Sequence, residues 1–174
     1  MNQGKSAIRP DAAYWIGKLR MTRHIEGGSF CEVYRSPGLI PVAGPDKSFS
    51  GDRSYSTSIY FLLEKGQFSA FHRIASDEIW HFYFGDPLHV YEIDRDGRLQ
   101  IHRLGPDADR GEVFQAVIRA GHWFASAPAD GSEYSLAGCT VAPGFDFADF
   151  ALADRNTLIN EYPQHADLVT RLTR

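Results

Sequence analysis

Two ionisable side chains that could move protons stand close together in one aromatic segment. His72 and Glu78 lie in the sequence FHRIASDEIWHFYFG, in which a short polar stretch separates two apolar runs. We expect the two runs to pair as an antiparallel hairpin that brings the imidazole and the carboxylate to about 5 Å at their Cβ atoms. Aromatic surroundings exclude water, and poor hydration perturbs pKa values. The segment therefore predicts acid–base chemistry, with His72 and Glu78 as the catalytic residues.

Two histidines in this segment need different interpretations. His81 follows Glu78 by three residues, and an odd spacing sends two strand residues to opposite faces. We therefore expect His81 to be a packed or interface residue. For His72 a second interpretation stays open, because a histidine among aromatic residues can also be a hydrogen-bonded core residue. Glu78 is harder to explain in that way, since a carboxylate between apolar strands is costly unless it is paired.

The elements that must position these residues are predicted to be mostly strands. After the Gly27-Gly28 turn, residues 29–35 alternate along the chain. Asp96-Gly97 between two apolar runs is a strong hairpin signal. The other predicted strands are short, rich in β-branched and aromatic residues and bounded by turn residues; they cover residues 56–63, 68–74, 78–84, 88–93, 98–103, 112–118 and 133–141.

Helices are expected only near the two ends. Residues 10–21 are predicted to be helical, and Leu168 and Leu172 indicate a short closing helix. Residues 36–55 are rich in Pro, Gly, Ser and Asp, and we expect a long loop near the mouth of the site. Frequent strands without helices between them predict an all-β fold, either a sandwich or a barrel.

Length and composition place the chain in the ordinary soluble class. Its 174 residues, 43% hydrophobic and 23% charged, predict one domain, with helical segments at 1–25 and 153–174 around a barrel at 26–152. A net charge of −4 disfavours nucleic acid and anionic membranes as partners. No membrane-spanning run or signal peptide is recognisable, so we expect a cytoplasmic protein. Cys31 and Cys139 lack metal-site spacing, and we expect free thiols.

Several motifs in the right order resemble those of the cupin superfamily. The first cupin motif is His-x-His, three or four residues, Glu, six residues and Gly; His72, Glu78 and Gly85 match it, while Ile74 replaces its second histidine. The second motif, Pro-x-Gly-x-x-His, resembles residues 119–124, in which Gly121 is kept and Phe124 replaces the histidine.

Three longer segments make the resemblance more specific. SAFHRIASDEIWHFYFGDPL, GCTVAPGFDFADF and EGGSFCEVYRS are similar to the small uncharacterised cupins related to deoxysugar-nucleotide epimerases. This resemblance implies a jelly-roll β-barrel with a cavity for a small-molecule ligand, and usually a homodimer. In epimerase-like cupins a histidine in a comparable place removes a proton beside a carbonyl, and the resemblance implies this role for His72.

A cupin metal centre resembles sets of three nitrogen ligands and one carboxylate. Ile74 and Phe124 offer no lone pair, so no firmly bound cofactor is predicted. A weakly bound divalent metal on His72 and Glu78 stays open as an alternative, and His122 is a substitute ligand if the register shifts.

Three functions are consistent with the sequence. They are a metal-independent isomerase, epimerase or lyase with His72 as base, a non-enzymatic ligand-binding cupin, and a metal-dependent oxygenase with an atypical site. Arginines could clamp a carboxylate or phosphate, and aromatic side chains could stack on a planar ligand. By residue type, we expect the substrate-binding residues to be Tyr34, Arg53, Tyr60, Arg73, Trp80, Phe82, Gln115 and Trp123.

Overall fold

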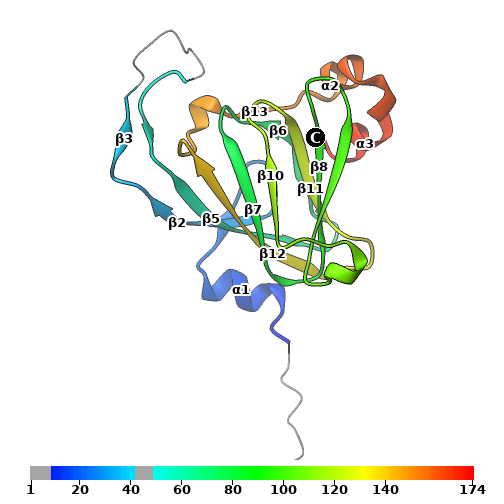
Figure 1. The fold of residues 1–174 in the computed structure, drawn as a ribbon. Coiled ribbons are helices and arrows are strands. Elements are labelled where there is room, and N and C mark those ends of the chain that lie inside the picture. Colours follow the sequence, from blue (N-terminus) through cyan, green and yellow to red (C-terminus); the bar gives the residue numbers. More distant parts are fainter. Residues whose placement is uncertain (1–8, 42–48) are drawn as a thin grey trace, which may run out of the picture.

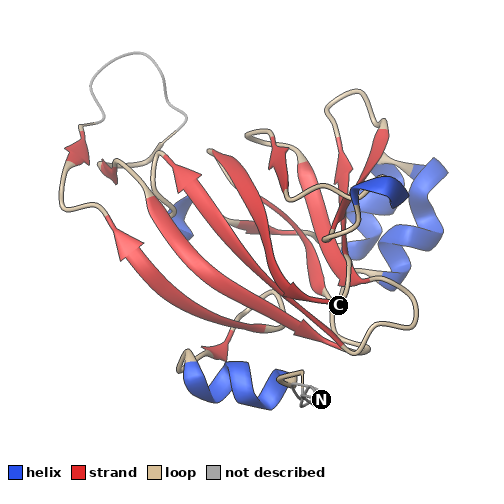
Figure 2. Ribbon diagram, turned by 60° about the horizontal axis from the view of Figure 1, so that its bottom comes forward, coloured by secondary structure: helices blue, strands red, loops and turns tan. Residues whose placement is uncertain are grey.

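The computed structural model describes residues 9–41 and 49–174 as two facing β-sheets (Figures 1 and 2). The six-stranded sheet has the order β1 (Thr22–Arg23), β2 (Ser29–Arg35), β5 (Thr57–Glu64), β12 (Tyr134–Ala142), β7 (Asp77–Gly85) and β10 (Gln115–Ile118). The five-stranded sheet has the order β13 (Ala151–Leu152), β6 (Ser69–Arg73), β11 (Trp123–Pro128), β8 (Leu88–Ile93) and β9 (Leu99–Leu104). A separate hairpin pairs β3 (Leu39–Ile40) with β4 (Arg53–Ser54).

Short helices cover the outer faces of both sheets (Figure 2). The helix α1 (Ala12–Lys18) packs on the six-stranded sheet, and Asp11 caps it by accepting a hydrogen bond from the Tyr14 amide at 2.8 Å. The helices α2 (Arg155–Glu161) and α3 (Ala166–Arg171) pack on the five-stranded sheet through buried residues such as Leu158 and Val169. Single 3₁₀ turns occur at Ala108–Arg110, Phe147–Asp149 and Pro163–His165. No helix of the described chain is long and apolar enough to cross a membrane.

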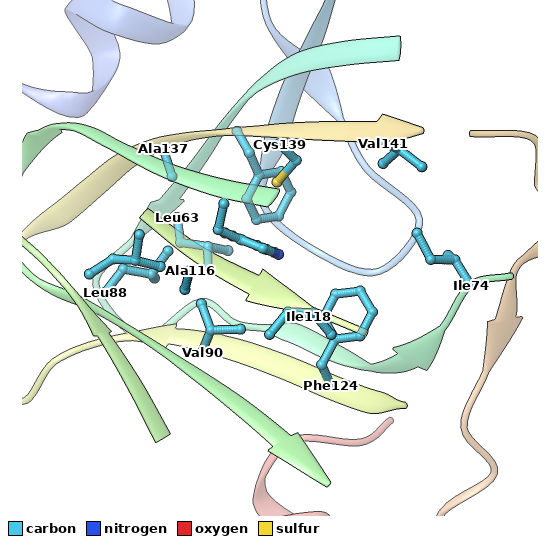
Figure 3. Packing of buried hydrophobic residues seen from close by; sticks show 13 residues of the cluster. Leu63, Ile74, Leu88, Val90, Ala116, Ile118, Phe124, Ala137, Cys139 and Val141 are labelled. Atoms are coloured by element: carbon cyan, nitrogen blue, oxygen red, sulfur yellow. The ribbon is translucent and has the colours of Figure 1, made fainter. Parts of the chain in front are cut away.

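The main core lies between the two sheets, where side chains from both inner faces meet (Figure 3). Inward residues alternate with outward ones along each strand, as period-two geometry requires. On β5, for example, Phe61 and Leu63 enter this core, whereas Leu62 belongs to the cluster beneath α1. Figure 3 shows Leu88 at one end of the core and Ile74 and Val141 toward the other.

Most of the predicted elements are confirmed. The all-β jelly-roll architecture with short terminal helices is present, although the two sheets face each other without closing into a continuous barrel. The strand predicted at 29–35 has those same bounds, and Gly27 and Gly28 take positive φ angles of 123° and 72° before it. The Asp96-Gly97 turn joins β8 to β9 as an antiparallel pair, and the Asp94 amide donates to the Arg98 carbonyl at 3.0 Å.

Several elements differ from the sequence-based expectation. The helix predicted at 10–21 is limited to α1, and the loop predicted at 36–55 contains the β3–β4 hairpin. Residues 1–8 and 42–48, which belong to the predicted N-terminal segment and to that loop, lie outside the described residues. The strand β11 was not predicted, whereas α2 lies within the helical segment predicted at 153–174. The β11 sequence, WFASAP, is rich in small residues, so it lacks the β-branched composition by which the other strands were recognised.

The predicted hairpin between His72 and Glu78 is wrong. His72 lies on β6, which pairs with β11 and β13, while Glu78 lies on β7, which pairs with β12 and β10. Between β6 and β7 the chain crosses from one sheet to the other, so the polar stretch is a crossover and not a hairpin turn. Local sequence cannot distinguish these two cases, because the partner strands come from distant parts of the chain.

Candidate functional site

A cavity of about 230 Å³ lies between the two sheets, at the end of the core that contains Ile74 and Val141 (Figure 3). Its wall combines buried acids, histidines and a thiol with aliphatic and aromatic side chains. The lining residues are His24, Glu26, Phe30, Glu32, Arg35, Thr57, Ile59, His72, Ile74, Glu78, Cys139, Val141, Phe145, Asp146 and Phe147. His72 and Glu78 therefore both line one cavity, but they do so from facing sheets.

His72 is almost completely buried, and protein atoms face both of its ring nitrogens. Its Nδ1 lies 2.7 Å from the carbonyl oxygen of Ala70, and its Nε2 lies 3.1 Å from Oε2 of Glu26. Because a carbonyl only accepts, Nδ1 must carry a hydrogen. Burial lowers the pKa of His72 to about 4, and the hydrogen bond to the Ala70 carbonyl raises it by a smaller amount. At neutral pH the ring is therefore uncharged, with Nε2 as an acceptor.

Because Nε2 of a neutral His72 accepts, its contact with Oε2 of Glu26 is a hydrogen bond only when that carboxyl group is protonated. Burial raises the pKa of the Glu26 carboxyl group, and the Ser69 hydroxyl donates to its Oε1 at 2.8 Å. A protonated Oε2 can donate to Nε2 of His72, which gives a neutral network in which each group is satisfied. His24 lies beside it, with Nδ1 3.6 Å from the same Oε2, and burial lowers its pKa.

Glu78 is the second buried acid of the cavity. It is 7% exposed, and burial raises its pKa to about 8. Its side-chain hydrogen bond is with the Cys139 thiol, whose own pKa burial raises well above its ordinary value. At pH 7 the inner end of the cavity therefore carries a mostly protonated Glu78, neutral imidazoles and a neutral thiol.

The mouth of the cavity carries the charges. Arg35 donates to both carboxylate oxygens of Glu32, at 3.1 and 2.7 Å, and to the Phe145 carbonyl at 3.1 Å. Asp146 is exposed nearby and contributes to the raised pKa of Arg35. Phe147 is 59% exposed and stacks against His24 at a ring separation of 6.3 Å. Aromatic and acidic groups thus surround the entrance.

None of the eight residues that were predicted to bind substrate lines this cavity. Tyr34 is exposed, Tyr60 faces the α1 side of its sheet, and Gln115 is exposed on the edge strand β10. Trp80 and Phe82 belong to the main core or pack against it. Their strands were predicted correctly, but strand periodicity does not indicate which inward positions border open space and which are filled.

The two arginines are committed to other contacts. Arg53 is buried and forms a bidentate pair with Asp149, with both N···O distances at 2.6 Å. Arg73 is exposed on the other side of β6, where its guanidinium lies 4.5 Å from the Trp123 ring centroid. Arg73 and Trp123 line a different, shallower hollow beside α2.

The remaining histidines of the motifs also have defined partners. His81 lies on the opposite face of β7 from Glu78, as expected, with Nε2 3.0 Å from the Thr140 hydroxyl oxygen. His122 does not reach the cavity, because its Nδ1 lies 2.7 Å from Glu92, a carboxylate that also contacts His102 at 2.7 Å.

The donor set does not fit a cupin metal centre. Phe124 is the direct cross-strand partner of His72, with ring centroids 4.1 Å apart, and Ile74 lines the same cavity. Both positions that correspond to missing histidines are thus filled by hydrocarbon. Across residues 9–41 and 49–174, no group of three or more His, Cys, Asp or Glu side chains is arranged to hold a metal ion. We therefore derive no chemical step through a metal.

Sequence reasoning missed two residues of the site: Glu26, which contacts His72, and Cys139, which contacts Glu78. Glu26 could have been recognised from its position directly before the Gly27-Gly28 turn. This turn brings the backbone of Glu26 next to β6, where the Ala70 amide donates to the Glu26 carbonyl at 2.9 Å. The signal for Cys139 was its alternation on 133–141 with the inward residues Ala137 and Val141.

Comparison with known proteins is consistent with this fold. A family model described as "Cupin superfamily (DUF985)" matches residues 13–153. The chain belongs to this cupin family. An uncharacterized protein of Saccharomyces cerevisiae, YML079W, is 33% identical over 143 residues, which cover 77% of this cupin and 71% of the yeast protein.

Solved structures give the same result. Protein SO0799 from Shewanella oneidensis is 38% identical to this cupin, with a TM-score of 0.84 and coverage of 95% of this chain and 98% of that one. A hypothetical protein from Leishmania major is 34% identical, with a TM-score of 0.83 and coverage of 94% and 99%. Oxalate decarboxylase from Bacillus subtilis, at 14% identity and a TM-score of 0.54 over 40% of its chain, shares the fold alone.

Proposed function

We propose that this cupin binds a small polar organic molecule in the cavity between its sheets. The observation that carries the proposal is a cavity with an exposed mouth whose inner end holds buried, hydrogen-bonding acids and histidines among apolar side chains. Binding sites are typically concave and apolar, with a few convergent polar groups that orient the ligand.

The size of the cavity limits the ligand. About 230 Å³ is below the usual range for drug-sized ligands. This volume favours a compact metabolite and disfavours a whole sugar nucleotide, the kind of ligand suggested by a resemblance to nucleotide-sugar epimerases.

The surroundings of His72 favour binding over base catalysis by that residue. A general base needs a free nitrogen and a pKa near the working pH. Both ring nitrogens of His72 face protein oxygens, and its pKa of about 4 lies far below neutrality. We therefore assign His72 the role of orienting Glu26 through Nε2.

A second candidate function is an isomerase-type proton transfer. The observation that favours it is Glu78, whose pKa of about 8 is near the value that general acid catalysis requires. In this case Glu78, and not His72, exchanges the proton with the ligand.

A ligand screen with a blocked cavity tests the proposal. Ile59 lines the cavity and is half-buried, so Ile59→Phe should fill part of it; Ile101→Phe, on the exposed face of β9, is the matched control. A ligand at 100 times its Kd stabilises the folded state by about 2.7 kcal/mol, which a thermal-shift screen detects. We expect hits for the wild type and for Ile101→Phe that Ile59→Phe loses. Hits that survive in Ile59→Phe would refute this location for the site.

A further inference from the structure

We propose that the ligand of this cavity is a small organic cation, such as a primary ammonium compound, and that Glu78 is its counter-ion. This inference rests on the proposed function and adds the charge class of the ligand.

The lining is rich in acids and poor in available cations. Four carboxyl groups face the cavity, those of Glu26, Glu32, Glu78 and Asp146, whereas the lining contains one guanidinium, that of Arg35, and no lysine. Arg35 already binds both oxygens of Glu32 and the Phe145 carbonyl, so an anionic ligand would have to displace Glu32 from it. The lining thus has no uncommitted Lys or Arg for an anion, whereas it has several oxygen acceptors for a cation.

Glu78 differs from Glu26 and Glu32 in having hydrogen-bonding capacity to spare, and from the exposed Asp146 in being buried. Glu26 is occupied by Ser69 and His72, and Glu32 by Arg35. Among the contacts of the described residues, Glu78 has the Cys139 thiol as its hydrogen-bond partner and no ion pair. A carboxylate accepts about four hydrogen bonds, so a buried one with a single weak donor can take an ammonium group with several N–H donors.

The protonation energetics agree with this geometry. Ionising Glu78 at pH 7 costs about tenfold in affinity, because its pKa is about 8. Creating a positive partner for an anion by protonating His72 costs about a thousandfold, because its pKa is about 4. A cation therefore meets a much smaller penalty than an anion of the same shape.

The mouth is also suited to a cation. Phe30, Phe145 and Phe147 line the cavity beside the acidic pair of Glu32 and Asp146, and Phe147 is exposed enough to meet an incoming ligand. Aromatic faces attract ammonium groups, and Asp146 adds negative potential along the entry path, whereas Glu32 is paired with Arg35.

The test uses probes that share a shape and differ in charge. Benzylammonium, benzyl alcohol and benzoate form one set, and butylammonium, butanol and butanoate form another; each is titrated into the wild-type protein at pH 7 by calorimetry. We expect each ammonium compound to bind at least tenfold more tightly than its alcohol, and the carboxylates to bind most weakly. Titrations in phosphate and in HEPES should show release of about 0.9 proton per ammonium ion, since Glu78 must ionise, and almost none for the alcohols.

Two variants assign the preference to its residues. Glu78→Gln keeps the shape of the side chain but cannot ionise, so the ammonium preference and the proton release should disappear while alcohol binding changes less than threefold. Glu133→Gln, at an exposed residue outside the cavity, is the matched control. Phe147→Ala, at the exposed mouth, should weaken ammonium binding about twofold to fivefold and alcohol binding less.

The outcomes separate the two proposals. If an alcohol or a carboxylate binds as tightly as the ammonium compound, and Ile59→Phe blocks that binding, the cavity binds small molecules but the inference about charge is overturned. An ammonium preference that persists in Glu78→Gln overturns the assignment of the counter-ion. If none of the six probes binds at millimolar concentration, both the inference and the proposed function are refuted.

Discussion

Replacing Glu78 by glutamine should change how the stability of the protein depends on pH. Burial raises the pKa of Glu78 from about 4.5 in the unfolded chain to about 8 in the folded protein. The folded protein therefore holds this proton more tightly than the unfolded chain. Its stabilising effect is complete below about pH 4.5, and it is lost as the pH rises through 8.

The size of the effect follows from the two pKa values. Between pH 6 and pH 9 the folded state gives up a proton that the unfolded chain has already lost, which lowers the free energy of unfolding by about 2 to 3 kcal/mol. Glu78→Gln has no such proton. Between pH 6 and pH 9 the free energy of unfolding should thus fall by about 2 to 3 kcal/mol less in the variant than in the wild type.

Urea unfolding at several pH values from 6 to 9 measures this difference. The wild type and Glu133→Gln, whose side chain is 71% exposed, should show the full decline, whereas Glu78→Gln should show a shallower one. Comparing variants at each pH cancels the contributions of other groups, including His72, whose lowered pKa costs stability only as the pH falls below about 6.5. Parallel curves for the wild type and Glu78→Gln would refute the burial-driven pKa shift of this group.

Three further substitutions, two of them with a matched control variant, test the site and its supports through the stability of the folded protein. His72→Ala should destabilise the protein by about 2 to 4 kcal/mol, because it leaves Glu26 without its acceptor and opens a hole beside Phe124; a loss below about 1 kcal/mol would contradict the network. Arg53→Met should lower the free energy of unfolding by about 3 to 5 kcal/mol, since it leaves Asp149 buried and unpaired. Its control, Arg35→Met at the half-exposed pair with Glu32, should lower it by about 1 kcal/mol or less. Equal losses of stability would contradict the role of burial. Gly28→Ala should lower the melting temperature far more than Gly66→Ala, although both glycines have φ above 70°. An added Cβ at Gly28 would lie 2.7 Å from the Leu62 carbonyl oxygen, whereas one at Gly66 would meet open space. Similar melting temperatures for the two variants would argue against the close approach at Gly28.

Local sequence patterns were sufficient for the fold class. Short aromatic and β-branched runs, separated by Gly, Pro and Asp-Gly, predicted the strands because each strand must alternate between a core face and an outer face whatever its partner. The Asp96-Gly97 turn could be predicted for the same reason, since it depends on backbone geometry within a few residues. Where this local signal was weak, as in β11, the prediction failed.

The sequence by itself also determined that His72 and Glu78 would have buried positions on strands. It also showed that Ile74, a hydrocarbon side chain, replaces the second histidine of the first cupin motif. Only the tertiary structure decided which groups meet. Glu26 is 46 positions before His72 in the numbering, yet their side chains are 3.1 Å apart, while Glu78, only a short way along the chain, faces the cavity from the other sheet. The physical reason is that strand pairing joins distant segments: β6 lies beside β11 and β13, so the direction of its inward side chains, and the space left before them, depends on residues from across the whole chain.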